Sequence, residues 1–337
     1  MDPVKHLALR IVFFLAALLA SANALCQELE ERAVIWKQTL AALEGGDFAA
    51  LEQQAARFRQ DRTRTSSGLW KLSLFYAAVG DFFDTDERGD TYWSERGKTV
   101  DRWVKAYPKS PTARIAYAQW LLNYAWSYRG NTYAKSVKPE NWAPFHAGTE
   151  SARAYLEKYK KIAAVDPQWY KTMETVATRQ SWADDRFQAL LDEALTRHPQ
   201  FYEIYFAAVT FYSPKWGGDA GAIETFARLA VERTRAQEGN GLYARIYWYA
   251  SQAQYDNRLF TESLARWSTM RAGIDDVLKS YPDEWNIQNF ARFACLAQDQ
   301  EKTLELMTRI REPTYPSVWG AEDAFQRCRT WAMRAVI

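Results

Sequence analysis

Histidine and cysteine are scarce in this chain of 337 residues, and neither sign of charge is in clear excess. There are three histidines and three cysteines, and no HExxH, GxSxG or paired CxxC pattern occurs. Histidine-based catalysis and zinc binding are therefore not predicted, and we expect no metal and no cofactor. The 43 Lys and Arg residues against 41 Asp and Glu leave a formal net charge of +2. Without a basic stripe or excess, a nucleic-acid partner is not expected.

Long apolar runs are also missing, except for one short run at the N-terminus. Lys5 and Arg10 give a positive start, residues 11–20 are apolar, and Ala22 and Ala24 supply the small residues that signal peptidase needs. We expect a signal peptide over 1–24 and a periplasmic or secreted mature chain without a membrane span. The apolar run is shorter than the roughly 20 residues of a good membrane helix, but an uncleaved anchor remains the alternative.

Aromatic residues, by contrast, are abundant at 15%, as expected where large rings fill the space between packed helices. Apolar residues recur at helical spacing, as in Phe187, Leu190, Leu191, Ala194 and Leu195. Helices are predicted over 28–43, 48–59, 69–83, 91–107, 284–297, 300–311 and 321–335, among others. No stretch alternates as a strand would, so the fold class is predicted to be all-α.

Proline marks the junctions between the predicted helices. Pro108, Pro167, Pro199 and Pro282 each follow the end of one helix and suit the first turn of the next. The spacing from Pro167 to Pro199 is close to the tetratricopeptide period of about 34 residues. We therefore predict stacked helical hairpins that form a tetratricopeptide-like α-solenoid, a single domain over 25–337.

Residues 125–130, Ala-Trp-Ser-Tyr-Arg-Gly, form the first unusual motif. Trp126 and Arg129 are three residues apart near a predicted helix end and so share a face. In one interpretation Arg129 binds the last helix carbonyls, Trp126 packs in the core, and loss of either side chain mainly lowers stability. In the other, the two side chains form a ligand-binding shelf.

Residues 214–219, Pro-Lys-Trp-Gly-Gly-Asp, form the second motif, predicted to be a tight turn with Asp219 capping the next helix. A helix N-terminus behind glycines can also bind an anion, which makes Lys215 and Trp216 ligand-binding candidates. The phosphate-loop spacing is absent, which favours the turn.

The two motifs together resemble the landmarks of a bacterial, tetratricopeptide-like family known only as a domain of unknown function. The resemblance covers roughly residues 70–300 and rests on helical spacing and the two motifs, with the further positions Tyr133, Ala134, Val137, Trp142 and Phe145. It implies an α-helical fold and no particular activity.

An acidic loop has part of the spacing of a calcium-binding helix-loop-helix. Asp84, Asp86, Gly89 and Glu95 occupy positions 1, 3, 6 and 12, but Arg88 stands where an oxygen ligand belongs. We therefore expect a solvated loop and no specific calcium binding.

Export to an oxidising compartment permits a disulfide, and three cysteines leave one over. Cys295 and Cys328 fall near the middle of two predicted helices separated by one helix, so we predict that they are joined. Cys26 is predicted to stay unpaired. It lacks a lipoprotein signal because Asn23 and Leu25 occupy the positions of the usual Leu and small residue. Two separate buried thiols are the alternative.

Two functions remain open at this point. The first is a non-catalytic helical-repeat protein of the bacterial envelope that binds a protein or peptide partner on an aromatic face. The second is a carboxylate-dependent, glycan-directed hydrolase on an α-helical scaffold, since rings stack on sugars and a carboxylate pair is not visible as a motif.

Overall fold

The computed structural model describes residues 27–83, 89–311, 313–320 and 323–334. Within these ranges the chain forms helices and no β-strand, and an isolated bridge pairs Arg64 with Trp70. The predicted all-α fold class is therefore confirmed. No helix within the same ranges is both long and apolar enough to cross a membrane. The predicted signal segment 1–24, Cys26, Asp84 and Asp86 lie outside the described residues.

The chain divides into two compact units. Unit 1 comprises Met1–Ala33, Thr65–Gly68 and Val277–Ile337, and unit 2 comprises Val34–Arg64 and Leu69–Asp276. Helices α2 (Gln27–Gly45) and α15 (Trp267–Ser280) each contain a boundary between units. The single repeat domain expected over 25–337 stays a prediction.

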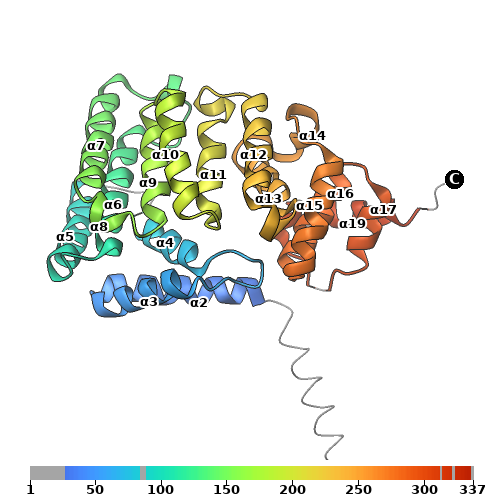
Figure 1. The fold of residues 1–337 in the computed structure, drawn as a ribbon, viewed down its shortest axis with the longest axis horizontal. Helices are drawn as coiled ribbons and strands as arrows, with labels where there is room; N and C mark the ends of the chain where they lie inside the picture. The colour runs from blue at the N-terminus through green and yellow to red at the C-terminus, as the bar shows by residue number, and fades with distance from the viewer. Residues whose placement is uncertain (1–26, 84–88, 312, 321–322, 335–337) are drawn as a thin grey trace, which may run out of the picture. The chain divides into compact units, whose positions relative to one another are not determined.

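Unit 2 is built from two layers of helices that alternate along the chain. The first layer is α4 (Lys71–Asp81), α6 (Pro111–Arg129), α9 (Gln168–Arg179), α11 (Tyr202–Phe211) and α13 (Gly241–Ala250), each packed against the next. The second layer is α5 (Asp90–Ala106), α7 (Pro139–Lys158), α10 (Asp184–Arg197) and α12 (Ala220–Glu238). Helices α7, α10 and α12 each pack on the first-layer helices before and after them, as stacked hairpins do, and α5 packs on α6. Helices α7 to α12 follow one another in chain order (Figure 1).

Shorter elements connect or flank these layers. Helix α3 (Phe48–Asp61) packs on α4 and α6. The connections are η2 (Ala134–Ser136), α8 (Lys160–Ala163), η3 (Pro214–Trp216), the π-helical turn η4 (Ser251–Tyr255), η5 (Asp256–Arg258) and α14 (Leu259–Glu262).

The helix ends in unit 2 follow from local sequence signals. Ser110 caps α6 by accepting a hydrogen bond from the backbone N–H of Ala113, and Pro111 occupies the first turn. The junction at Pro199 separates α10 from α11, as the sequence predicts. Small residues also bring α6 and α7 together, because a Cβ at Gly148 would lie 2.7 Å from the Cβ of Ala125.

A buried ion pair, here called the Asp166 cluster, holds the N-terminal part of unit 2 together. Asp166 has no exposed surface, and its Oδ2 accepts hydrogen bonds from Arg59 Nη1 at 2.6 Å and Tyr76 Oη at 2.7 Å. Its Oδ1 accepts a third from the backbone N–H of Gln168. Arg59 also donates to Thr112 Oγ1. A buried charge is tolerated when it is paired and hydrogen-bonded, and both conditions are met here.

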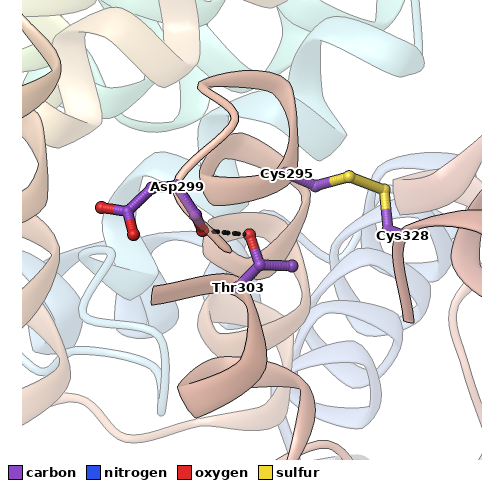
Figure 2. The surroundings of a disulfide bond; sticks show 4 residues. All are labelled: Cys295, Asp299, Thr303 and Cys328. Carbon is purple, nitrogen blue, oxygen red and sulfur yellow. Dashed lines mark hydrogen bonds between the residues drawn. A yellow bond between two sulfur atoms is a disulfide. The ribbon is translucent and has the colours of Figure 1, made fainter. Parts of the chain in front are cut away.

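Unit 1 contains the C-terminal helices. They are α16 (Glu284–Leu296), α17 (Gln300–Met307), α18 (Pro316–Trp319) and α19 (Ala324–Ala332). Helix α16 packs on each of the other three. Asp299 caps α17, and its carbonyl oxygen accepts a hydrogen bond from Thr303 Oγ1 at 2.6 Å (Figure 2).

A disulfide joins Cys295 to Cys328, the pair that the sequence predicts, with a Cα–Cα distance of 5.9 Å (Figure 2). Two details of the expected geometry differ. Cys295 is the penultimate residue of α16 and not near its middle, and a short helix, α18, lies between the predicted helices 300–311 and 321–335. The heights still match because α19 packs directly on α16.

Candidate ligand-binding site

The motif at 125–130 ends helix α6. Gly130 is the cap residue, with φ of +68°, and its N–H donates to the carbonyl oxygen of Trp126. Arg129 Nη1 donates to the carbonyl oxygens of Gly130 at 2.8 Å and Thr132 at 2.6 Å. Arg129 therefore binds the carbonyls just beyond the helix end, which is close to the structural role considered for it.

Trp126 is half-buried and not a full core residue. Its ring meets Phe145 edge to face, and its Nε1 donates to Asn131 Oδ1 at 2.8 Å. Two guanidinium groups lie over the ring, that of Arg129 at 4.7 Å and that of Arg179 at 4.6 Å from its centroid. A cation at such a distance is attracted to an indole face.

The motif at 214–219 forms η3 and the tight turn that the sequence predicts. Asp219 caps α12 by accepting a hydrogen bond from Ala222 N–H. Gly217 has a φ of +94°, and Gly218 fits because a Cβ there would overlap the backbone carbonyl of Tyr212. The two glycines are thus required for different reasons, one conformational and one steric.

Lys215 and Trp216 point to different surroundings. Lys215 Nζ donates to the carbonyl oxygen of Ala253, within the π-helical turn η4, at 2.7 Å. This turn leaves carbonyls without regular helix partners, and Lys215 satisfies one of them. Trp216 instead approaches Trp126, with ring centroids 6.3 Å apart. The structure therefore brings the two motifs together through their tryptophans and places Lys215 away from that contact.

Two cavities on the first layer of unit 2 share one face of helix α9. Lys171, Thr175 and Arg179, at positions i, i+4 and i+8 of that helix, line both. The aromatic cavity, about 200 Å³, is completed by residues that include Trp126, Phe206, Trp216 and Tyr249. The polar cavity, about 250 Å³, is completed by residues that include Asp81, Gln119 and Asn123. Together the two form a trough along α9.

The far wall of the aromatic cavity is built from two stacked rings. Phe206 of α11 and Tyr249 of α13 are stacked with centroids 5.0 Å apart. Tyr249 Oη lies 2.9 Å from Thr210 Oγ1, one turn further along α11. Stacking and the hydrogen bond fix both rings, so this wall is preorganised for a flat or apolar group.

The α9 face is positively charged. Burial, and after it the charge of Arg129, lowers the pKa of Arg179 to about 9. Burial lowers the pKa of Lys171 as well, although Glu203 acts in the opposite direction. Both shifts mean that the folded protein holds these cations in a place unfavourable to positive charge.

A buried carboxyl group lies on the same helix. Glu174 has no exposed surface, and neither of its oxygens has a hydrogen-bond partner among the described residues. Burial raises its pKa well above the ordinary value, which favours the neutral form. A neutral Glu174 contributes no negative charge to balance Lys171.

Sequence reasoning missed the α9 residues and the Phe206–Tyr249 wall. Neither belongs to a motif, because each is a set of side chains brought together by helix packing. One local signal was present. Lys171, Thr175 and Arg179 form a polar stripe on a helix whose other faces are largely buried.

The remaining candidate groups have structural surroundings. Glu95 of the acidic loop is exposed and bonds to Lys98 at 2.7 Å, which lowers the pKa of Glu95. His146 stacks on Trp142, and burial lowers the pKa of His198, whose Nε2 lies 3.4 Å from the carbonyl oxygen of Ala164. Within the described ranges no group of three or more His, Cys, Asp or Glu side chains could hold a metal ion.

No protein-family model, curated protein or solved structure matches this chain. The resemblance to the family of unknown function therefore stays a prediction, and the function must be argued from the site.

Proposed function

We propose that this chain is a non-catalytic helical-repeat protein of the bacterial envelope that binds an extended protein or peptide segment in the trough along α9. The main evidence for this proposal is the trough itself. Two cavities adjoin on one helix face, one with aromatic walls and one with polar walls. Both lie on the first layer of stacked hairpins, the kind of surface on which helical repeats bind their partners.

An extended segment fits two adjoining cavities better than a compact ligand does. Successive side chains of an extended chain point to opposite sides, so alternate residues face the same surface. One such side chain can enter the aromatic cavity between Trp126 and Tyr249 while the next on that side reaches Gln119 or Asn123. Alternate side-chain pockets are a recurring means of peptide recognition.

The carboxylates at the trough support binding over the hydrolase alternative. A glycosidase needs two carboxyl groups roughly 5 to 9.5 Å apart across the scissile bond. Among the described residues that line the aromatic cavity, Glu203 is the one carboxylate, and Asp81 is the one that lines the polar cavity. Asp81 is already engaged, because its Oδ2 accepts a hydrogen bond from Trp36 Nε1.

Location in the envelope rests on two features of different kinds. The N-terminal 24 residues have the pattern of a cleaved signal peptide. The Cys295–Cys328 disulfide is of a kind that persists in oxidising compartments. N-terminal sequencing of the protein recovered from a periplasmic fraction should begin at Leu25. A chain that still begins at Met1 and sediments with membranes would instead indicate the uncleaved anchor.

The binding proposal is tested by capture from envelope extracts on a blocked and an unblocked protein. Thr175 lines both cavities, so Thr175→Trp fills the trough without removing a charge. Thr99→Trp is a matched control on α5, since both threonines donate to the carbonyl four residues earlier in their helices. We expect wild type and Thr99→Trp to retain the same polypeptide and Thr175→Trp to lose it.

Two results would contradict the binding proposal. Retention of every captured polypeptide by Thr175→Trp would show that the trough is not the binding surface. A screen in which no polypeptide is retained specifically while soluble glycans are hydrolysed would favour the hydrolase.

A further inference from the structure

Several half-buried arginines of unit 2 have a carboxylate partner. Arg59 pairs with Asp166, Arg64 with Glu238, and Arg153 with Glu150 and Glu157. Arg179 has no such partner among the described residues, and neither has Arg129, although both are half-buried and lie over the same indole ring. Two guanidinium groups on one ring repel each other, and nothing negative in the described structure separates them.

Hydrogen-bond donors are left over at the same place. A guanidinium has five N–H donors, and among the described residues the side chain of Arg179 makes one hydrogen bond, from Nη1 to the carbonyl oxygen of Leu122 at 2.6 Å. Lys171 carries an ammonium group with three donors and has no hydrogen-bond acceptor among the described residues. Arg179 and Lys171 line the same cavity, so their spare donors converge on one space.

The protein balances the charge in that space only in part. Glu174 lies beside Lys171 in sequence, but its carboxyl is buried without a hydrogen bond and favours the neutral form. Glu203 is the one carboxylate lining the aromatic cavity within the described ranges, against the two cations. Arg129, behind Trp126, adds a third positive charge.

We propose that the aromatic cavity binds a carboxylate carried on an aromatic or apolar group, with Arg179 and Lys171 holding the carboxylate and Trp126, Trp216 and Tyr249 enclosing the apolar group. Arginine beside a carboxylate forms charge-assisted hydrogen bonds, and such bonds are strong where water is partly excluded. The inference rests on the proposed function, whose partner it describes. The captured segment would present an acidic side chain or a terminal carboxylate beside an apolar one.

A pair of small probes isolates the role of charge. Phenylacetate and phenylacetamide share the same ring and nearly the same shape and differ in the negative charge. Calorimetric titration of the full-length protein should show that phenylacetate binds about tenfold or more tightly than the amide, because hydrogen bonds to charged groups are the stronger kind. Equal affinities for the two probes would overturn the proposal.

Two variants locate the effect, and a third controls for stacked arginine in general. Arg179→Met and Lys171→Met should each abolish the preference for phenylacetate while keeping the unfolding midpoint near that of wild type. Arg186→Met is the control, because Arg186 lies on helix α10 outside the trough and its guanidinium group is 3.4 Å from the ring centroid of Trp182. It should leave the preference unchanged. If it removes the preference, or if neither cavity variant does, the assignment to Arg179 and Lys171 is wrong.

Failure of this inference can be told apart from failure of the proposed function. A polypeptide that is lost by Thr175→Trp but captured normally by Arg179→Met would support the proposed function and contradict the carboxylate inference. Charge-dependent phenylacetate binding by a protein that captures no polypeptide would keep the carboxylate site and remove the peptide partner. Phenylacetate at saturation should displace the captured polypeptide from wild type, and unchanged retention would contradict the inference.

Discussion

Two arginine clusters in unit 2 use the same residue types in opposite ways. In the Asp166 cluster, Arg59 is joined at 2.6 Å to a carboxylate that also accepts hydrogen bonds from Tyr76 and Gln168. On α9, Arg179 meets Trp126 and a backbone carbonyl but no carboxylate in the described part of the chain. In the first cluster the arginine is paired with a carboxylate, and in the second the arginine keeps N–H donors that have no acceptor among the described residues.

The difference is visible in the direction of the pKa shifts. Although burial acts to lower it, the pKa of Arg59 is raised, because Asp166 and its neighbours stabilise the charged form. The pKa of Arg179 is lowered to about 9, since burial and Arg129 act on it together. Breaking a buried ion pair by removing one partner destabilises the fold, whereas a buried cation without a partner costs free energy as it stands.

The largest expected effect comes from opening the complete cluster. Asp166→Ala leaves Arg59 without its carboxylate and removes the hydrogen-bond acceptor of Tyr76. Removal of one partner of a buried ion pair costs about 3–5 kcal/mol. Urea denaturation should show this loss, and Asp192→Ala, which breaks an exposed pair with Arg233, should cost no more than about 1 kcal/mol. Equal losses in the two variants would contradict the structural role of Asp166.

The disulfide provides a reference effect outside both clusters. Cys295 and Cys328 are separated by 33 residues in sequence. Closing a loop of that length should stabilise unit 1 by about 3–4 kcal/mol in the chain-entropy model. Cys328→Ser should lower the unfolding midpoint accordingly and leave phenylacetate affinity unchanged. Non-reducing peptide mapping that finds both residues as free thiols would remove the bond from the account.

A smaller effect is expected where the second motif positions Trp216. Gly218→Ala forces a Cβ into the carbonyl of Tyr212 and should cost about 2–3 kcal/mol, because the backbone must move. Gly217→Ala places a side chain at a φ of +94° with open space around it and should cost about 1 kcal/mol. Both are measured by thermal unfolding. A larger loss of stability in Gly217→Ala than in Gly218→Ala would show that the turn tolerates displacement of the backbone that carries Trp216.

The buried carboxyl near the open cluster should make stability depend on pH. The folded-state pKa of Glu174 is raised above its ordinary value of 4.5, so the folded protein holds this proton more tightly than the unfolded chain does. The contribution of Glu174 to the stability of the fold is therefore fully present below about pH 4.5. It is lost as the pH rises toward the pKa of Glu174 in the folded protein. Glu174→Gln should remove this loss and gain up to about 1.4 kcal/mol on wild type between pH 5 and 6. If the free energies of unfolding of wild type and Glu174→Gln change with pH in the same way, the pKa of Glu174 is not raised in the folded protein.

The fold was predictable because its signals are local. Apolar spacing, the prolines at helix junctions and caps such as Asp219 each depend on a few neighbouring residues, and the helices begin and end close to the predicted places. The boundary errors fall where packing overrides pattern. Helix α17 ends at Met307, short of the predicted 311, and α18 lies in the stretch between the predicted helices 300–311 and 321–335.

The candidate site was only half predictable, for a physical reason. Trp126 and Trp216 belong to motifs with unusual composition and could be singled out, but their contact depends on how α6 and η3 pack. Lys171 and Arg179 are ordinary surface-like residues in the sequence, and their gathering beside a single carboxylate, Glu203, appears only when α6, α9 and α11 are assembled. Lys215 was chosen for its motif, yet its ammonium group serves the carbonyl of Ala253.

The comparison between the clusters is tested most directly by measuring the stability of Arg59→Met and Arg179→Met side by side at neutral pH. Arg59→Met should lose about 3–5 kcal/mol, because Asp166 remains buried and unpaired. Arg179→Met should match or exceed wild type, because the cation it removes is opposed by burial and by Arg129, and methionine keeps the packing volume. A loss in Arg179→Met as large as that in Arg59→Met would contradict the account, because Arg179 would then serve the fold and not a ligand.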